Sequence, residues 1–440
     1  MLSDPIAAVA TPAGRSALAI VRLSGNGAFD VAARVIPAFT SAPPRTAHLA
    51  TFHTARHETI DRGLYTVFPA PGSYTGEDLV ELTCHGGFVV PLRLVTALYA
   101  AGARAAAPGE FTRRAVLNGK MDLLQAEAVG DLIDATAPAQ ARLAIHQLDG
   151  ALSRRIETLR SGIIEIEALL GYSIDFPEED DGPIPVERVL GAIDQSRATI
   201  DRLIRTAPAG QRLREGALVV IAGRPNAGKS SLFNALVGTD RVLVSAVPGT
   251  TRDAVEAYTD FEGWPIRLMD TAGLGEFESE VDRLGVDVSR RYIEAADVLL
   301  LCVDAGHEAD DVERELTDAR TIRLRTRSDL NRPTSPGIPV SVVSGEGLDQ
   351  VRQLVAARAF AEPLAALDLE PALTRERHRE SLLRSATALN EARERITLDA
   401  DPVLASHHVR DAAHSLDELI GTVDIEMVLD RLFASFCIGK

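Results

Sequence analysis

The segment LVVIAGRPNAGKSSLFNALVG, residues 218–238, restricts the fold of this 440-residue chain more than any other feature. Gly223, Gly228, Lys229 and Ser230 follow an apolar strand candidate and stand at the start of a helix candidate. Glycines there let backbone N–H groups face phosphate oxygens, and the helix N-terminus adds a partial positive charge. The lysine of such a loop reaches the β- and γ-phosphates, while the serine hydroxyl ligates Mg²⁺. The residues predicted to contact the nucleotide here are Asn226, Ala227, Gly228, Lys229, Ser230 and Ser231.

Two later motifs complete the pattern of a nucleotide switch. The sequence DTAG at 270–273 follows an apolar strand candidate, so Asp270 can hold Mg²⁺ through water and the Gly273 N–H can contact the γ-phosphate. Between the loops, GTTRD at 249–253 offers a threonine hydroxyl that completes the Mg²⁺ shell only while γ-phosphate is present. We therefore expect Ser230 and Thr251 to ligate Mg²⁺. Further nucleotide contacts are predicted at Gly249, Thr250, Thr251, Asp270, Thr271, Ala272 and Gly273.

Residues 326–329, Thr-Arg-Ser-Asp, concern the choice of base. Guanine-specific proteins usually carry Asn-Lys-x-Asp here, and Asp329 keeps the carboxylate that accepts both guanine N–H groups. Thr326 replaces the asparagine, and Arg327 can stack its stem on the base. The segment 341–343, Ser-Val-Val, stands where such proteins present an N–H to the guanine oxygen. We expect GTP rather than ATP, with room for a weakened affinity; the alternative is that Asp329 is an ordinary turn residue.

The residue that activates water is less evident. Leu274 follows DTAG where many GTPases have a water-orienting glutamine, and no arginine stands in an obvious position to act as a finger. Asn226 can instead help to hold a monovalent cation that supplies the missing charge. The acidic candidates for water activation are Glu276, Glu278, Glu280 and Asp282.

The pattern along the chain predicts a multidomain α/β protein with three domains. Residues 1–118 alternate short strand-like and helical runs, which indicates a small α+β domain. Residues 119–214 and 361–440 are helical, and an apolar stripe from Leu152 to Leu170 at three- and four-residue steps predicts burial against other helices. Between them, 215–360 alternate strand and helix, which predicts an inserted domain with a mostly parallel sheet. Strands are expected at 217–223, 264–270, 297–305, 321–327 and 338–344, helices at 27–35 and 89–101, and an acidic loop at 172–185.

Composition and charge exclude several classes of protein. The formal charge is −17, so bulk polyanions are repelled and any nucleic acid needs a local patch or a partner. Three cysteines without a CxxC pair argue against a disulfide scaffold and a cysteine-rich zinc site. The longest apolar run, 298–303, is far shorter than a membrane span, and the N-terminus does not read as a signal peptide. We expect a soluble, cytoplasmic protein without a membrane partner.

Lysine is rare in this chain. Of the 46 basic residues only Lys120, Lys229 and Lys440 are lysine, and the other 43 are arginine. A coding bias explains most of this. Lysines that survive it indicate positions where a compact ammonium is needed and a planar guanidinium would fail.

Long motifs spread over the whole chain resemble the MnmE (TrmE) family of tRNA-modifying GTPases. They include SYTGEDLVELTCHGG at 73–87, APGEFTRRAVLNGKMDLLQAEAVGDLIDA at 107–135 and the terminal FASFCIGK at 433–440, besides the nucleotide motifs. The resemblance implies an N-terminal dimerisation domain that binds folate, a helical domain and an inserted Ras-like G domain. It also implies a homodimer and a heterotetramer with the FAD-dependent MnmG (GidA) protein. Together they would add a carboxymethylaminomethyl or aminomethyl group to C5 of the wobble uridine, U34, of certain tRNAs.

The resemblance also implies cofactors and residue roles. The one-carbon donor would be a 5-formyl- or methylene-tetrahydrofolate, bound through Arg22, Glu81, Lys120 and Lys440. A K⁺ ion held by Asn226, Ser245, Val247 and Thr250 would replace an arginine finger, with Ala246 and Pro248 also beside GTP. Asp282 stands where the family has a water-orienting glutamate, and Cys437 belongs to the terminal motif as a catalytic thiol or a small buried residue.

Two rival functions share the nucleotide motifs. A GTP-dependent ribosome-assembly switch would normally carry an explicit RNA-binding domain and would lack the CIGK end. A P-loop ATPase or small-molecule kinase would require that Asp329 is incidental.

Overall fold

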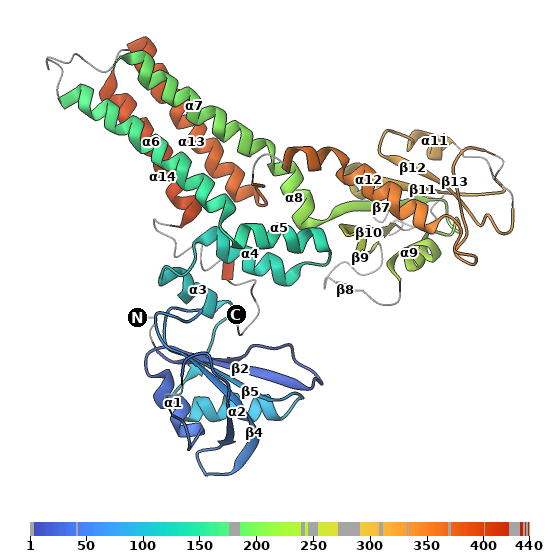
Figure 1. Ribbon diagram of the computed structural model, residues 1–440. Coiled ribbons are helices and arrows are strands. Elements are labelled where there is room, and N and C mark those ends of the chain that lie inside the picture. Colours follow the sequence, from blue (N-terminus) through green and yellow to red (C-terminus); the bar gives the residue numbers. More distant parts are fainter. Residues whose placement is uncertain are drawn as a thin grey trace, which may run out of the picture. The chain divides into compact units, whose positions relative to one another are not determined.

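The computed structural model (Figure 1) places most of the chain in two compact units. One unit comprises residues 1–130 and 417–440, and the other residues 131–416. The predicted three-domain division remains a prediction. The structure describes residues 4–40, 43–175, 185–238, 243–244, 254–271, 291–307, 311–331, 333, 335–367, 371–399, 401–421, 432–433, 436 and 439.

The first unit is built on a six-stranded sheet with the order β3-β4-β5-β2-β1-β6. Its strands pair antiparallel, except that β1 and β6 are parallel. Along β2, Val21 and Leu23 are buried under α1 and α2, whereas the alternate residue Arg22 faces the other side. Its elements are β1 Ile6–Val9, β2 Leu18–Ser24, α1 Ala28–Val35, β3 His48–His53, β4 Thr59–Phe68, β5 Leu79–His85, α2 Val90–Ala100, β6 Arg104–Ala105, α3 Glu110–Leu117 and the start of α4 Leu123–Asp134. The α+β fold predicted for the N-terminal part of the chain is confirmed.

The helical part of the second unit is a long bundle in which α6, α7, α13 and α14 run side by side (Figure 1). Every member of the predicted stripe from Leu152 to Leu170 is buried, which confirms it as the core face of α6. The acidic loop was predicted to begin at Tyr172, but α6 continues to Asp175 because the first proline comes only at Pro177. The elements are α5 Pro138–Leu148, α6 Ala151–Asp175, α7 Val186–Arg205, α8 Ala207–Glu215, α13 Glu376–Glu394, a π-helix Arg395–Asp399 and α14 Pro402–Ile420. Helix α12 Leu348–Leu367 packs instead on the sheet of the α/β part.

The α/β part carries a seven-stranded sheet with the order β13-β12-β11-β7-β10-β9-β8. Strands β13 to β10 are parallel, and β9 and β8 extend one edge antiparallel. The mostly parallel sheet is therefore confirmed, whereas β9 was not predicted. The last predicted strand, 338–344, ends at Val340 because the chain turns at Ser341, whose hydroxyl accepts the N–H of Ser344 at 3.2 Å. The elements are β7 Ala217–Gly223, α9 Lys229–Val237, β8 Leu243–Val244, β9 Ala254–Phe261, β10 Trp264–Thr271, β11 Val298–Asp304, α11 Asp311–Glu315, β12 Thr321–Thr326 and β13 Ile338–Val340.

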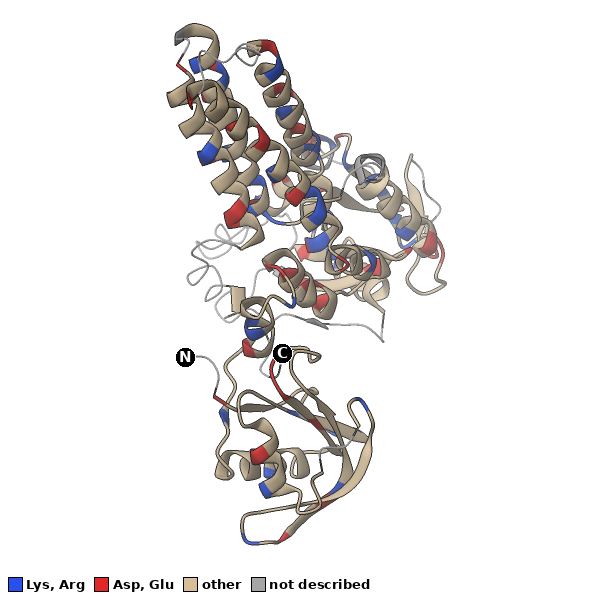
Figure 2. Cartoon of the chain, turned by 60° about the vertical axis from the view of Figure 1, so that its left-hand side comes forward, with Lys and Arg blue, Asp and Glu red and all other residues tan. Residues whose placement is uncertain are grey.

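Charged residues of both signs occur in both units. Lys and Arg are interspersed with Asp and Glu along the helices of both units (Figure 2). Among the described residues, no helix is both long enough and apolar enough to cross a membrane.

Candidate functional site

The phosphate loop connects β7 to α9. All of β7 is buried in the sheet, so the loop begins from a rigid position. Gly223 has φ 141°, and a Cβ there would lie 2.3 Å from the Cys302 carbonyl oxygen, so only glycine fits. Asn226 and Gly228 also have positive φ, at 63° and 84°. Asparagine and glycine tolerate this conformation, which explains why these residue types occupy the bends of the loop.

Lys229 opens α9 and is turned back into the loop. Only 6% of the residue is exposed, and its Nζ donates to the Arg224 carbonyl oxygen at 2.8 Å. Burial lowers the pKa of the Lys229 ammonium, and the charge of Asp270 opposes part of that fall. A buried cation held by a backbone carbonyl of this loop is suited to an anionic ligand.

Asp270 lies at the end of β10, beside β7 in the sheet. Burial raises the pKa of its carboxyl group, and a hydrogen bond with Ser230 and the charge of Lys229 oppose that rise. Its Oδ1 is buried and has no hydrogen-bond partner among the described residues. A carboxylate oxygen without a partner beside a serine hydroxyl is the kind of hard-oxygen pair that Mg²⁺ prefers, so these residues fit the ion. The structure thus brings Lys229, Ser230 and Asp270 together.

The predicted base-reading segment lies directly beside the phosphate loop. The Thr326 hydroxyl, at the end of β12, donates to the Ala227 carbonyl oxygen at 2.8 Å and is buried. Thr326 therefore fastens the loop to the sheet through its hydroxyl. Arg327 has φ 58° and pairs with Asp304 at 3.2 Å. Asp329 is exposed in the following turn.

The turn after β13 lies next to this segment. The Ser328 N–H donates to the Val340 carbonyl oxygen at 3.2 Å, and the Ser328 hydroxyl donates to Glu346 at 2.7 Å. Ser341 is buried, whereas 87% of Val343 is exposed. The two segments predicted to surround the base are therefore neighbours.

Several predicted residues lie outside the described part of the chain. They include the switch segment, the end of DTAG, the candidates for water activation and most of the terminal motif. They are Ser245, Ala246, Val247, Pro248, Gly249, Thr250, Thr251, Ala272, Gly273, Glu276, Glu278, Glu280, Asp282, Cys437 and Lys440.

In the first unit, Arg22 and Glu81 form an ion pair. They are register partners on β2 and β5, and Arg22 Nη2 lies 2.8 Å from Glu81 Oε1. Both side chains are partly exposed, at 20% and 27%. The guanidinium of Arg22 also lies over the rings of Tyr74 and Phe111, at 5.4 and 5.6 Å from their centroids. An ion pair flanked by aromatic rings can bind a flat polar ligand.

Lys120 reaches the loop that carries Tyr74. Its Nζ donates to the Pro71 carbonyl oxygen at 2.9 Å. The Tyr74 hydroxyl is hydrogen-bonded to Thr112 at 2.8 Å, and burial raises its pKa. The loop 69–78 therefore connects Lys120 with the surroundings of Arg22, so three of the four predicted folate residues gather around one loop.

Arg114, which no sequence motif singled out, supports this loop through Glu77. Arg114 is 1% exposed and bonds Glu77 at 2.9 Å, Asp4 at 3.1 Å and Glu110 at 3.2 Å. Its only sequence signal is its position in the segment EFTRRAV, which does not distinguish it from Arg113. The terminal motif belongs to the same unit, because a Cβ on Gly439 would lie 2.4 Å from the Val9 carbonyl oxygen at the end of β1.

A second unpredicted cluster lies where the α/β part joins the helices. Asp131 Oδ1 accepts hydrogen bonds from Arg214 Nε at 3.0 Å and Arg375 Nη2 at 2.7 Å. Arg214 precedes β7, and Arg375 precedes α13, so one carboxylate holds both segments that connect the α/β part to the bundle. Asp131 and Arg214 border a cavity of about 90 Å³, which Gln140 and Thr374 also line.

Comparisons with known proteins cover the whole chain. A family model described as the GTP-binding protein TrmE N-terminus matches residues 5–120, and one described as the MnmE helical domain matches residues 123–437. A tRNA modification GTPase MnmE from Thermus thermophilus is 41% identical over 447 residues, 100% of this chain and 99% of the relative. The MnmE of Aquifex aeolicus is 37% identical over 451 residues, 100% of both chains. Among solved structures, the G domain of the T. maritima FeoB iron transporter is 27% identical and covers 32% of this chain and 98% of its own, with a TM-score of 0.28.

Proposed function

Because the chain belongs to the MnmE family of tRNA modification GTPases, we propose that its GTP hydrolysis drives modification of the wobble uridine of certain tRNAs. The product carries a carboxymethylaminomethyl or aminomethyl group at C5 of U34, and the FAD-dependent MnmG (GidA) protein is the partner in a heterotetramer. The observation that carries this proposal is the meeting of Lys229, Ser230 and Asp270 in a chain matched along its full length by MnmE proteins.

The nucleotide is held by the residues of the phosphate loop. Lys229 binds the β- and γ-phosphates, and Ser230 with Thr251 ligates Mg²⁺, which Asp270 holds through water. Bound Mg²⁺ neutralises charge that develops on the phosphates. Thr326 keeps the loop in position through Ala227, and Asp329 accepts the guanine N–H groups.

Hydrolysis in this proposal needs a K⁺ ion and a carboxylate. Asn226, at a bend of the loop, holds K⁺ together with oxygens of Ser245, Val247 and Thr250. The ion supplies the positive charge that an arginine finger gives in other GTPases. Asp282 orients the attacking water, with Glu280 as the alternative; both residues lie outside the described part of the chain.

The N-terminal unit binds a 5-formyl- or methylene-tetrahydrofolate in this proposal. Arg22 and Lys120 attract the anionic glutamate tail, and Glu81 accepts donor groups of the pterin ring. Support comes from the shared loop 69–78, to which both cations extend. Lys440 completes the site from the terminal motif, which reaches β1 at Gly439. Cys437 of the same motif acts as a catalytic thiol or packs as a small buried residue.

A second copy of the chain covers the apolar part of the N-terminal sheet, so that the protein is a homodimer in the cytoplasm. Support comes from Leu49 and Leu64, which are register partners on β3 and β4 and are 61% and 41% exposed. Leu18 on β2 is 60% exposed on the same sheet. Apolar neighbours left exposed in this way mark interaction surfaces.

The chain carries a formal charge of −17, so MnmG supplies part of the tRNA-binding surface.

Nucleoside mass spectrometry on a deletion strain tests the proposal. Its tRNA should lack the modified wobble uridine, and expression of the wild-type chain should restore it. Unmodified tRNA should persist with Lys229→Ala. If the deletion leaves the tRNA unchanged and instead disturbs ribosomal subunits, the rival ribosome-assembly switch is correct. GTP turnover in KCl and in NaCl tests the ion, and equal rates would exclude K⁺ activation.

A further inference from the structure

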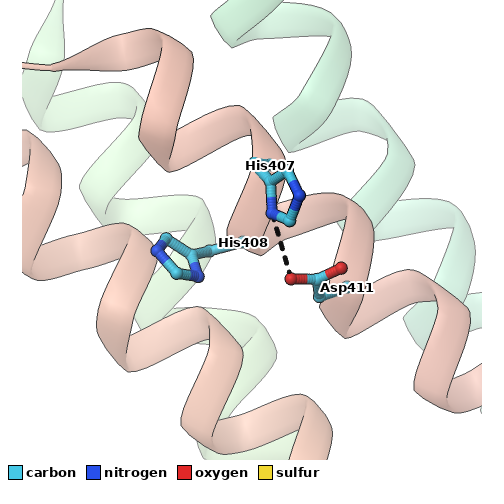
Figure 3. Close-up of side chains that lie close together, drawn as sticks. All are labelled: His407, His408 and Asp411. Atoms are coloured by element: carbon cyan, nitrogen blue, oxygen red, sulfur yellow. Dashed lines mark ion pairs between the residues drawn. The ribbon is translucent and has the colours of Figure 1, made fainter.

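Helix α14 carries two histidines and an aspartate whose potential ligand atoms converge. Each of His407, His408 and Asp411 offers one such atom, and these atoms all lie within 4.8 Å of one another (Figure 3). His407 and Asp411 are one helical turn apart, and His407 Nδ1 lies 3.1 Å from Asp411 Oδ2. None of these residues belongs to the nucleotide or folate sites.

A fourth residue from another helix joins this group. Glu391 on α13 places its Oε2 3.0 Å from His408 Nδ1, and His408 is the least exposed member at 20%. A carboxylate at this distance places a further metal-binding oxygen beside the histidine nitrogen. The arrangement therefore has a second carboxylate within reach, besides the three potential ligands.

We propose that His407, His408 and Asp411 form a binding site for a divalent transition-metal ion of the Zn²⁺ type, supported by Glu391. Zn²⁺ binds imidazole nitrogen and carboxylate oxygen at about 2.0–2.2 Å in tetrahedral sites. Ligand atoms of such a site are roughly 3.3 Å apart, so small side-chain rotations close the group around the ion. His407 and Asp411 are 72% and 54% exposed, so solvent leaves room for these rotations.

The ligand set selects the class of ion. Two imidazoles favour Zn²⁺, Ni²⁺ or Cu²⁺, whereas Mg²⁺ and Ca²⁺ take oxygen ligands almost exclusively. The nearest basic residue on the same helix, Arg410, is turned to Glu167 on α6 at 2.8 Å, so its charge is engaged elsewhere. Asp411 and Glu391 thus supply two negative charges that balance the ion.

Bound metal would connect α14 with α13 through His408 and Glu391. The site goes beyond the proposed function, because it neither touches the nucleotide nor depends on tRNA. Its consequence concerns stability: an ion that binds only the folded chain stabilises the bundle, and the gain increases with the affinity and the concentration of the ion.

Titration calorimetry with ZnCl₂ tests the site on the full chain, without a histidine tag, stripped with EDTA and held in excess MgCl₂ and GDP. We expect one Zn²⁺ per chain and a higher unfolding temperature with Zn²⁺. His407→Ala and His408→Ala should each remove this binding, and Glu391→Gln should weaken it roughly tenfold or more. His85→Ala is the matched control, because His85 forms a single pair with Asp61 at 2.9 Å; it should keep one Zn²⁺.

Three results would overturn the site. They are no zinc binding by the wild type, equal binding by His407→Ala, and loss of binding in His85→Ala alone. If His408→Ala does not fold, zinc binding is measured instead on His407→Ala and Asp411→Asn. Both substitutions lie on the exposed side of α14 and leave the core of the bundle intact.

Discussion

The phosphate loop and the Arg22–Glu81 pair are both charged sites, yet they satisfy their charges in different ways. In the loop, burial lowers the pKa of Lys229 and raises that of Asp270, and one oxygen of Asp270 has no partner among the described residues. In the N-terminal unit, Arg22 and Glu81 meet directly at 2.8 Å while partly exposed to water. The charges of the loop need a bound ligand to neutralise them, whereas Arg22 and Glu81 already neutralise each other.

This difference separates two ways of building a binding site. A triphosphate with Mg²⁺ neutralises the buried charges of Lys229 and Asp270, so the same electrostatic interactions favour both binding and catalysis. A ligand of the N-terminal unit must instead compete with an existing ion pair. Partly exposed ion pairs contribute only about 0–1 kcal/mol to stability, so a ligand loses little binding free energy by breaking the pair. Buried, incompletely neutralised charge therefore marks the stronger candidate site.

The largest expected effect follows removal of the buried cation of the loop. Lys229→Ala should lower GTP turnover by roughly 10²–10³-fold, because a preorganised charge on the transferred phosphoryl group is lost. Arg22→Ala, the matched loss of a cation from the N-terminal pair, should leave GTP turnover unchanged. Phosphate release measured on both variants checks this, and similar losses in the two would remove the distinction between the regions.

A half-buried carboxylate that is paired with two guanidinium groups extends the comparison. Asp131→Asn leaves Arg214 and Arg375 without their shared anion. Breaking buried pairs costs about 3–5 kcal/mol, and since these side chains are 15–30% exposed we expect about 2 kcal/mol. Urea unfolding followed through Trp264, the only tryptophan, reports this unit, because Trp264 stacks on Phe360.

Asp134→Asn is the control for this variant. Asp134 is an exposed carboxylate that lines the same cavity. Its loss should leave the unfolding midpoint within error of the wild type. Equal destabilisation by the two variants would show that the cavity, rather than the ion pairs of Asp131, determines stability.

How far the sequence predicts these regions depends on the separation of the residues involved. Strand β7, the bends of the phosphate loop and the start of α9 lie within one segment, so spacing and residue type predict them. Asp131 meets Arg375 across 244 positions. No local pattern identifies such a partner, because tertiary packing brings it into place.

Similar reasons explain the other differences. Strand β9 was not predicted, and its pairing with β10 through an antiparallel hairpin departs from the parallel alternation of the rest of the sheet. In the sequence, Thr326 stands in place of the asparagine of guanine-specific proteins. In the structure its hydroxyl donates to the Ala227 carbonyl oxygen at 2.8 Å, a contact that exists because the fold places the end of β12 beside the phosphate loop.

Asp270 should show a stability effect opposite in sign to that of Asp131. Burial raises the pKa of its carboxyl group in the folded chain, so the stability it contributes is complete below pH 3.8 and is lost as the pH rises through the folded-state value. At pH 7 the ionised carboxylate therefore opposes folding. Asp270→Asn should raise the unfolding midpoint of the chain in EDTA while abolishing Mg²⁺-dependent GTP turnover. A lower midpoint would mean that Lys229 depends on Asp270 for its place in the fold.

The smallest effect is expected at the pair itself. A double-mutant cycle with Arg22→Gln and Glu81→Gln should give a coupling energy of about 0.5 kcal/mol, because both side chains are partly exposed and salt screens their attraction. Hydrogen exchange of the β2 and β5 amides measures it locally, and the coupling should fall further in 1 M salt. A coupling above about 2 kcal/mol would make the pair a structural element that a folate could not open. If the coupling is small, Arg22→Gln should weaken tetrahydrofolate binding far more than it changes the hydrogen exchange of the β2 and β5 amides. That result would show that Arg22 serves ligand binding rather than the stability of the fold.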